Sequence, residues 1–237
     1  MLKIENVTTH YGPIRALHNI SIEVGQNEIV CLLGGNASGK STTMKTILGI
    51  VKPTNGQVKF MGRRIDGLNT HKIVRLGISP VPEARRVFAR LTVRENLEMG
   101  AFIHRKNKDY DIEAEMTEIF SLFPRLKERL SQDANTMSGG EQQMLAIGMA
   151  LILKPALLLL DEPLLGLSPM MQVMLIEAIT NLKQESGITI LITEQFARPV
   201  LPIIDRGYVM ENGMLALAGT GAELMDNPEI KSAYFGI

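Results

Sequence analysis

Residues 34–41 read Gly34-Gly35-Asn36-Ala37-Ser38-Gly39-Lys40-Ser41 and set the architecture around them. They follow the apolar run Glu28–Leu33, which predicts a strand covered on both faces, and precede Lys40–Leu48, which predicts a helix closed by Gly49. A strand, a glycine-rich loop and a helix N-terminus together attract phosphate, because the loop amides and the helix dipole face the anion. The sequence therefore predicts an α/β nucleotide-binding protein.

The loop supplies three kinds of phosphate contact. Lys40 places a positive charge near the β and γ phosphates, and the hydroxyl of Ser41 is a ligand of the kind Mg²⁺ prefers. Backbone amides supply the rest. The residues expected to contact ATP here are Gly34, Gly35, Asn36, Ala37, Ser38, Gly39, Lys40, Ser41 and Thr42.

Two carboxylates follow a second apolar strand. Leu157–Leu160 ends at Asp161 and Glu162, and ligands of open α/β sheets bind beyond the carboxyl ends of the strands. Asp161 suits Mg²⁺ coordination, directly or through water. Glu162 suits orienting and deprotonating the water that attacks the γ phosphate.

A second glycine-rich segment, Ser138-Gly139-Gly140-Glu141-Gln142, opens another helix. Ser138 and Glu141 form a capping box, so helix initiation explains those two residues. It does not explain the glycines, each of which costs about 1 kcal/mol against alanine inside a helix. Close approach of a phosphate to bare backbone accounts for Gly139 and Gly140.

Periodicity predicts the remaining organisation. The first 60 or so residues read as an antiparallel sheet, residues from about 87 to 153 as helices, and the last part as an α/β core again. The specific expectations are a strand over Gln57–Met61 after the turn Asn55-Gly56, a capping box at Thr92, strands at Ala156–Leu160 and Ile188–Thr193, a helix from Ser168-Pro169 to Gly187, and a hairpin at Asn212-Gly213.

Composition excludes several classes of protein. The chain has 25 basic and 25 acidic residues, which argues against a protein that holds nucleic acid or anionic lipid mainly by its own charge. Cys31, the single cysteine, lies in a buried strand, and the four histidines lack metal-ligand spacing. No signal peptide or membrane-spanning stretch is evident, so we expect a cytoplasmic protein.

These motifs, in this order and spacing, resemble the ATP-binding-cassette (ABC) family over nearly the whole chain. More narrowly, the runs Pro82–Phe88, Thr136–Gly148 and Ser232–Gly236 are similar to the smaller ATP-binding subunit of branched-chain amino-acid importers, with urea or amide importer subunits as near neighbours. The resemblance implies a P-loop NTPase: a RecA-like core with an N-terminal antiparallel β subdomain (1–86 and 154–237) and an inserted helical subdomain (87–153).

The family resemblance also implies partners. Two cassettes would enclose two ATP molecules head to tail, each presenting its Ser138–Gln142 segment to the other's phosphate loop. The second cassette would be this chain itself or a related larger one, and both would sit on transmembrane permease subunits at the inner face of the cell membrane. Tyr11 would stack on adenine, although a core aromatic remains an alternative. Glu83, where most cassettes have Gln, would offer an oxygen to Mg²⁺ and water.

Departures from the family pattern bear on catalysis. Gln195 replaces the usual His that contacts the γ phosphate, and Ser168 replaces an Asp. Gln cannot supply a cation or shuttle a proton, so we expect weak or partner-dependent hydrolysis. Ala37 replaces a usual Gly, at about 1 kcal/mol if its φ is positive, and the loop is expected to be slightly reshaped. Pro199 and Pro202 are expected to shorten or kink the next helix.

Two alternatives stay open. A soluble cassette ATPase acting in repair, translation or cluster assembly is disfavoured, because the chain has no long coiled-coil insertion and no second cassette in tandem. A hydrolysis-poor regulatory subunit, whose ATP acts as a structural clamp, is compatible with Gln195 and Ser168.

Overall fold

A six-stranded sheet forms the centre of the computed structural model, which describes residues 1–83 and 87–232. Its order is β10-β9-β3-β8-β7-β6, and β9, β3, β8, β7 and β6 run parallel while β10 is antiparallel to its neighbour. Every residue of β3 is buried, as its uninterrupted apolar sequence predicts. The strands are β3 (Ile29–Leu33), β6 (Ile78–Val81), β7 (Leu157–Asp161), β8 (Thr189–Glu194), β9 (Arg206–Glu211) and β10 (Met214–Gly219).

The N-terminal region forms a separate antiparallel sheet of order β2-β1-β4-β5. One prediction was wrong in detail: Asn55-Gly56 does not turn before the strand but starts it, because Asn55 pairs with Thr8 of β1. A turn follows this strand instead, at Met61 and Gly62, which both have positive φ. The strands are β1 (Leu2–Tyr11), β2 (Ile14–Val24), β4 (Asn55–Phe60) and β5 (Arg63–Arg64).

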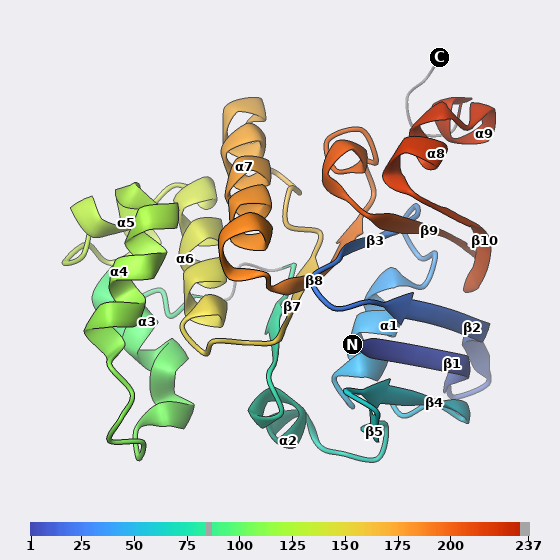
Figure 1. The fold of residues 1–237 in the computed structure, drawn as a ribbon, viewed down its shortest axis with the longest axis horizontal. Helices are drawn as coiled ribbons and strands as arrows, with labels where there is room; N and C mark the ends of the chain where they lie inside the picture. Colours follow the sequence, from blue (N-terminus) through green and yellow to red (C-terminus); the bar gives the residue numbers. More distant parts are fainter. Residues whose placement is uncertain (84–86, 233–237) are drawn as a thin grey trace.

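Helices from the middle of the chain form a distinct group, green to yellow in Figure 1, beside the core sheet. Gly148 is packed so closely there that an added Cβ would lie 3.0 Å from Ile119 and 3.2 Å from Leu97. The capping box predicted at Thr92 is confirmed. The group comprises α3 (Val93–Gly100), η1 (Ala101–His104), α4 (Ile112–Leu122), α5 (Pro124–Glu128), η2 (Ala134–Thr136) and α6 (Gly139–Leu151).

The helices that pack on the two sheets carry the predicted signals. In α7, Ser168 caps the N-terminus with Pro169 as the first helical residue, and Gly187 ends the helix at φ 62°. After Gln195 the only described helical segment before β9 is the short η3, consistent with the expected effect of Pro199 and Pro202. The remaining elements are α1 (Lys40–Ile47), α2 (Thr70–Arg75), α7 (Pro169–Ser186), η3 (Leu201–Ile203), α8 (Gly221–Asp226) and α9 (Pro228–Ile230).

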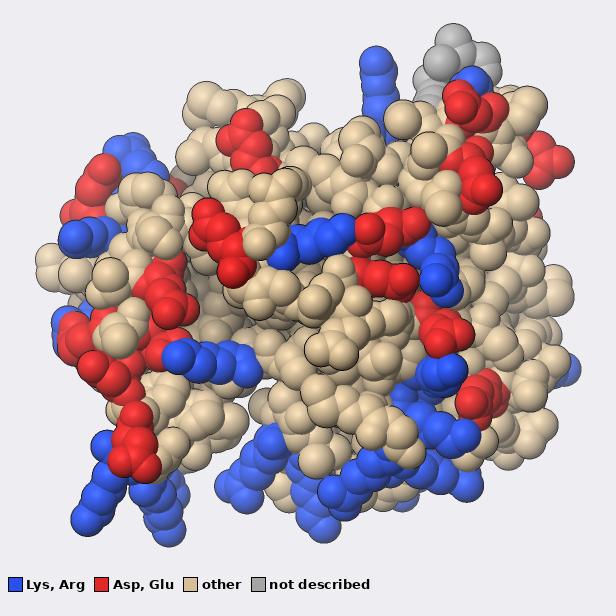
Figure 2. All heavy atoms as spheres, in the orientation of Figure 1, with Lys and Arg blue, Asp and Glu red and all other residues tan. Residues whose placement is uncertain are grey.

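Charge is unevenly distributed although the chain as a whole is neutral. Figure 2 shows Lys and Arg gathered along the lower edge of this face, below the position of α2 and β5, whereas acidic and basic side chains alternate elsewhere.

Within the described part of the chain, none of the helices is both long and apolar enough to span a bilayer. The run Ala84-Arg85-Arg86 and the end 233–237 lie outside the described residues.

Candidate functional site

A cavity of about 620 Å³ opens over the phosphate loop. The loop and α1 form its floor, and the β1–β2 hairpin and the residues after β7 and β8 form its walls. It gathers most of the residues predicted to bind ATP or catalyse its hydrolysis: Tyr11, Asn36, Ala37, Ser38, Gly39, Lys40, Ser41, Thr42, Glu83, Glu162 and Gln195. One cavity thus contains the groups that would bind the phosphates and those that would catalyse the attack of water on them.

The phosphate loop is a tight turn that leaves little room for larger residues. A Cβ on Gly34 would lie 2.5 Å from the carbonyl oxygen of Met210, and Gly39 has φ 110°. Ala37 adopts φ 63°, which is the left-handed conformation for which the sequence predicts strain. The β9–β10 turn braces the loop, since the amide of Gly213 donates to the carbonyl of Ser38 at 2.9 Å.

Lys40 is buried at the base of the cavity, with a side chain only 3% exposed. Its Nζ donates to the carbonyls of Gly34 at 2.7 Å and Gly35 at 3.0 Å, and it forms an ion pair with Glu162 at 3.1 Å. These three oxygens satisfy all three N–H donors of the ammonium group. The cation is therefore held within reach of both the loop and the carboxylate predicted to be the base.

Thr193 of β8 fixes the acidic pair. Its hydroxyl donates to Asp161 at 2.6 Å, while the amide of Glu162 donates to the carbonyl and hydroxyl of Thr193 at 3.0 and 3.1 Å. Glu162 has φ 48°, a left-handed conformation that is unusual for this residue type. Burial raises the pKa of Asp161, although the Thr193 hydroxyl opposes that rise. The neighbouring strand thus holds the carboxylate of Asp161 and the backbone of Glu162, whose carboxylate pairs with Lys40.

Glu194 is a buried carboxylate that the sequence reasoning missed. It ends β8, is 1% exposed, and accepts a hydrogen bond from the amide of Leu164 at 3.0 Å. Burial raises its pKa to about 7, and the nearby charge of Glu162 acts in the same direction. The sequence did carry an indication of this residue, because Thr193-Glu194 directly follows the apolar run Ile190–Ile192 and adjoins Gln195 of the predicted site.

The residues predicted to hold Mg²⁺ are hard oxygen donors, which fits that ion. Ser41 and Glu83 line the cavity; Asp161 does not, although it ends the strand immediately before Glu162. The residues that the structure describes contain no cluster of three or more His, Cys, Asp or Glu able to hold a metal by themselves. The donor set therefore fits a metal that the nucleotide phosphates help to bind.

The second glycine-rich segment does not line this cavity. Ser138 and Glu141 form the predicted capping box, and Glu141 also pairs with Arg129 at 2.8 Å. Gly140 also packs closely against α7: an added Cβ would lie 2.4 Å from the terminal methyl and 3.0 Å from Cγ of Met171, so that side chain would have to move. The amide side chain of Gln142 donates to the carbonyl of Ala134 at 2.9 Å. Helix packing thus accounts for part of this motif.

Residues that no motif marked also line the cavity. Ile14, Arg15 and Ala16 come from the β1–β2 hairpin, Leu165 follows Glu162, and Asn212 lies in the β9–β10 turn. Tyr11 is 42% exposed, which is inconsistent with the alternative of a core aromatic. The hairpin contributions depend on how the two sheets pack, which no local motif encodes.

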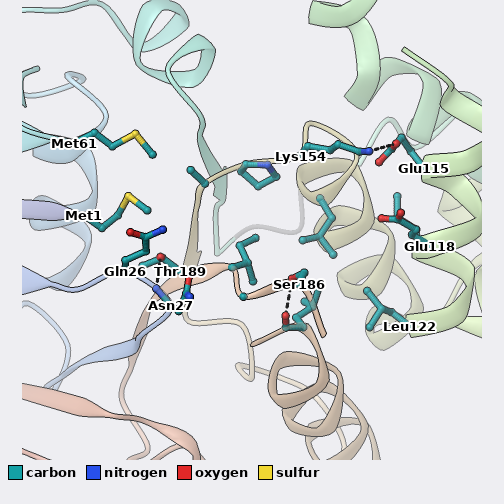
Figure 3. Close-up of a pocket in the computed structure, with 17 residues that line it drawn as sticks. Met1, Gln26, Asn27, Met61, Glu115, Glu118, Leu122, Lys154, Ser186 and Thr189 are labelled. Carbon is teal, nitrogen blue, oxygen red and sulfur yellow. Dashed lines mark hydrogen bonds and ion pairs between the residues drawn. The ribbon is translucent and has the colours of Figure 1, made fainter. Parts of the chain in front are cut away.

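A second cavity, of about 400 Å³, lies beneath the opposite ends of β7 and β8 (Figure 3). Figure 3 shows Glu115 and Glu118 facing it from α4, and Met1 and Met61 facing it from the N-terminal sheet. Lys154 forms an ion pair at 2.5 Å with Glu115, whose side chain is only 7% exposed. The walls are mostly apolar and include no phosphate-binding loop, so this cavity is distinct from the candidate site.

Comparison with known proteins places these features in a family. A family model described as "ABC transporter" matches residues 17–165. The chain is 49% identical to BraG of Pseudomonas aeruginosa, a high-affinity branched-chain amino acid transport ATP-binding protein, over the full length of both. It is 34% identical to LivF of Archaeoglobus fulgidus, a probable protein of the same description, covering 100% of this chain and 99% of the other.

Solved structures agree with the sequence comparison. An ATP-binding cassette of an ABC transporter, in its ADP conformation, superposes with a TM-score of 0.84 at 27% identity, covering 100% of this chain and 99% of that one. A nucleotide-free cassette gives a TM-score of 0.85 at 28% identity, over 99% and 98% of the two chains. The predicted α/β architecture, with its antiparallel N-terminal sheet and mostly parallel core sheet, is confirmed.

Proposed function

This chain belongs to the ABC transporter family of ATP-hydrolysing cassettes, and we propose that it is the ATP-binding subunit of an importer of branched-chain amino acids. The observation that carries the proposal is the 49% identity to BraG along the whole of both chains. A full-length relative of different function, the lipopolysaccharide export protein LptB of Haemophilus influenzae, reaches 32%. The solute assignment therefore follows the stronger similarity.

ATP would bind with its phosphates on the loop and its base against Tyr11. Lys40 already lies among the loop carbonyls and Glu162, so incoming phosphate oxygens would compete with Glu162 for its ammonium group. Glu162, released in part from Lys40, would accept a proton from the attacking water. General base catalysis of this kind contributes roughly 10²- to 10⁴-fold to a rate.

The other groups at the site would complete the chemistry. Ser41 and Asp161, together with Glu83, would hold Mg²⁺, which would neutralise phosphate charge as phosphoryl transfer proceeds. Gln195 lines the cavity and could bind the γ phosphate as a neutral donor. Its lack of charge supports slow intrinsic turnover, and for the same reason a hydrolysis-poor regulatory subunit is the second candidate function.

A head-to-tail dimer of cassettes, which the family resemblance implies, would account for the position of Ser138–Gln142. This segment starts α6, in the helical group of Figure 1, and does not line the cavity that contains Lys40. A second cassette, either this chain or a related larger one, would bring the equivalent segment to the open side of the phosphate loop. The exposed Ser138 and the backbone amides at the N-terminus of α6 suit a phosphate contact.

Membrane subunits would dock on an apolar surface of the helical group. Phe88, Met99, Phe102 and Ile103 are each between 38% and 51% exposed, and the last three lie within five consecutive residues. Contiguous exposed apolar side chains of this kind mark interaction surfaces. Docking there would place the chain at the inner face of the cell membrane as a peripheral subunit.

Uptake in reconstituted vesicles tests the proposal. The cassette, its partner cassette and the membrane subunits would be reconstituted with the cognate binding protein, and uptake of labelled leucine would be compared with uptake of labelled urea. ATP-dependent leucine uptake that ceases with Glu162→Gln supports the proposal. Urea uptake without leucine uptake would assign the chain to the neighbouring importer class, and failure to associate with any membrane subunit would favour a soluble ATPase.

A further inference from the structure

Glu194 is a buried acidic residue to which the mechanism above gives no role. Its side chain is almost fully removed from water, and burial of a carboxylate is unfavourable unless other groups compensate for the lost hydration. A neutral glutamine could accept the same amide hydrogen bond at lower desolvation cost. The presence of a carboxylate therefore calls for a reason beyond packing.

The contacts of Glu194 join three parts of the site. Its side chain accepts from the amide of Leu164, two residues after Glu162, and its carbonyl accepts from the amide of Gly34 at 3.2 Å. The next residue along the chain is Gln195, which lines the nucleotide cavity. Glu194 thus contacts the start of the phosphate loop and the loop that carries the base.

Other contacts also hold this segment, including the Leu165 amide on the carbonyl of Glu162 and the Leu167 amide on the carbonyl of Leu164, each at 3.2 Å. The amide of Glu162 is held by Thr193, and the carbonyl of Leu164 accepts from the side chain of Gln172 at 3.4 Å. Glu162 has a positive φ, a conformation that persists only where the surroundings fix it. Leu164 lies two residues after Glu162, so a side chain that accepts a hydrogen bond from the Leu164 amide can stabilise the conformation of Glu162.

We propose that Glu194 is a positioning residue for ATP hydrolysis: its carboxylate fixes the loop after Glu162 to the end of β8, so that Glu162 and Gln195 keep a common orientation toward the nucleotide. This proposal deepens the proposed function and rests on it. An ionised acceptor forms the stronger hydrogen bond to an amide, which accounts for a carboxylate at this position. The loop is then held most firmly when Glu194 is charged.

Glu194 also titrates in the neutral range. The titratable groups that act on it are Glu162 after β7, Lys40 in α1 and Cys31 in β3. Burial raises the pKa of Glu194 to about 7, Glu162 adds to the rise, and Lys40 opposes it. Acidification from pH 8 to pH 6 therefore neutralises the carboxylate and weakens its hold on the Leu164 amide.

The test compares Glu194→Gln and Glu194→Ala with wild type in the transporter complex, using kcat for ATP between pH 6 and pH 8. Displacement of a catalytic group by about 1 Å can lower a rate roughly 100-fold, so Glu194→Ala should lower kcat by roughly 10- to 100-fold without a matching loss of ATP affinity. Glu194→Gln keeps an acceptor but not the charge, so its kcat should lie between those of Glu194→Ala and wild type, several-fold below wild type at pH 8. Relative to Glu194→Gln, wild type should lose activity several-fold between pH 8 and pH 6.

Glu28→Gln is the matched control, because Glu28 also accepts a backbone amide, that of Gly25 at 2.7 Å, but lies outside the nucleotide cavity. Dividing the kcat of each variant by the wild-type kcat at the same pH removes the effect that ionisation of ATP has on both rates. Wild-type kcat in Glu194→Ala, or Glu194→Gln as impaired as Glu194→Ala, would overturn the proposal. So would a wild-type pH profile in Glu194→Gln.

Hydrogen exchange separates failure of this inference from failure of the proposed function. The Leu164 amide should exchange at least tenfold faster in Glu194→Ala than in wild type, whether or not the protein hydrolyses ATP. Unchanged exchange would show that Glu194 does not hold this loop. Absence of hydrolysis by the wild-type complex would instead contradict the proposed function.

Discussion

Replacing Ala37 with glycine should stabilise the protein. Ala37 has φ 63° in the phosphate loop, and its methyl group is exposed, so the change removes no buried contact. An L-residue in the left-handed region costs roughly 1–2 kcal/mol relative to its preferred conformation. Glycine avoids that strain, but it gives back about 0.4–1 kcal/mol through the greater freedom of the unfolded chain.

The midpoints of these two ranges, about 1.5 and about 0.7 kcal/mol, leave a gain in the free energy of unfolding of about 0.8 kcal/mol. For a domain of 150–250 residues each kcal/mol shifts Tm by roughly 2–4 °C, so the expected rise in Tm is about 2–3 °C. Denaturant titration and thermal unfolding, both without nucleotide, measure the two quantities. The slope of the denaturant transition should not change, because the surface exposed on unfolding is unchanged.

Ala114→Gly provides a matched control, since Ala114 is exposed in the first turns of α4, where φ is helical. There the same substitution should destabilise by roughly 0.5–1 kcal/mol. Opposite signs at the two positions would support the strain at Ala37. If Ala37→Gly lowers stability as much as Ala114→Gly does, the left-handed conformation carries no strain and the reasoning is refuted.

Three further outcomes are expected. Gln195→His should raise kcat for ATP hydrolysis, and an unchanged kcat would show that this position does not limit turnover. Lys154→Met leaves the buried carboxylate of Glu115 unpaired and should lower the free energy of unfolding by about 1–3 kcal/mol in urea titration. Arg125→Met removes one partner of an exposed ion pair and should change that free energy by less than about 0.5 kcal/mol. Equal effects of the two substitutions would show that burial of Glu115 does not make its ion pair important for stability. Burial raises the pKa of Glu194 from 4.5 to about 7, so folded protein retains a proton that unfolded protein releases; this contribution to stability is full below pH 4.5 and is lost as the pH rises through 7. Wild type should therefore lose up to roughly 3 kcal/mol of stability between pH 4 and pH 8 relative to Glu194→Gln, and parallel stability profiles would contradict the raised pKa.

The elements predicted best are those with a signal inside one stretch of chain. The capping boxes at Thr92 and Ser138, and the helix from Pro169 to Ser186, depend on side chains within three or four residues of the helix ends. The turn predicted at Asn55-Gly56 was wrong because Asn55 pairs with Thr8, which lies far away in the sequence, and this pairing makes the dipeptide the start of a strand. Tertiary pairing there overrides a local preference.

The same distinction applies to the site. The phosphate loop and the acidic pair are contiguous motifs, and the structure brings Lys40 and Glu162 into contact although 122 positions separate them. The packing of Gly140 could not be predicted from the sequence, because its close neighbour Met171 belongs to another helix. The role of Glu194 depends on one hydrogen bond to Leu164, a contact with no sequence pattern.

The central claim is that this chain hydrolyses ATP with Glu162 as the base. ATP hydrolysis by the assembled complex, measured with wild type, Glu162→Gln and the exposed control Glu211→Gln, tests it most directly. We expect Glu162→Gln to lower kcat by roughly 10²- to 10⁴-fold while ATP binding persists, and Glu211→Gln to match wild type. A Glu162→Gln complex that turns over ATP at the wild-type rate would contradict the account.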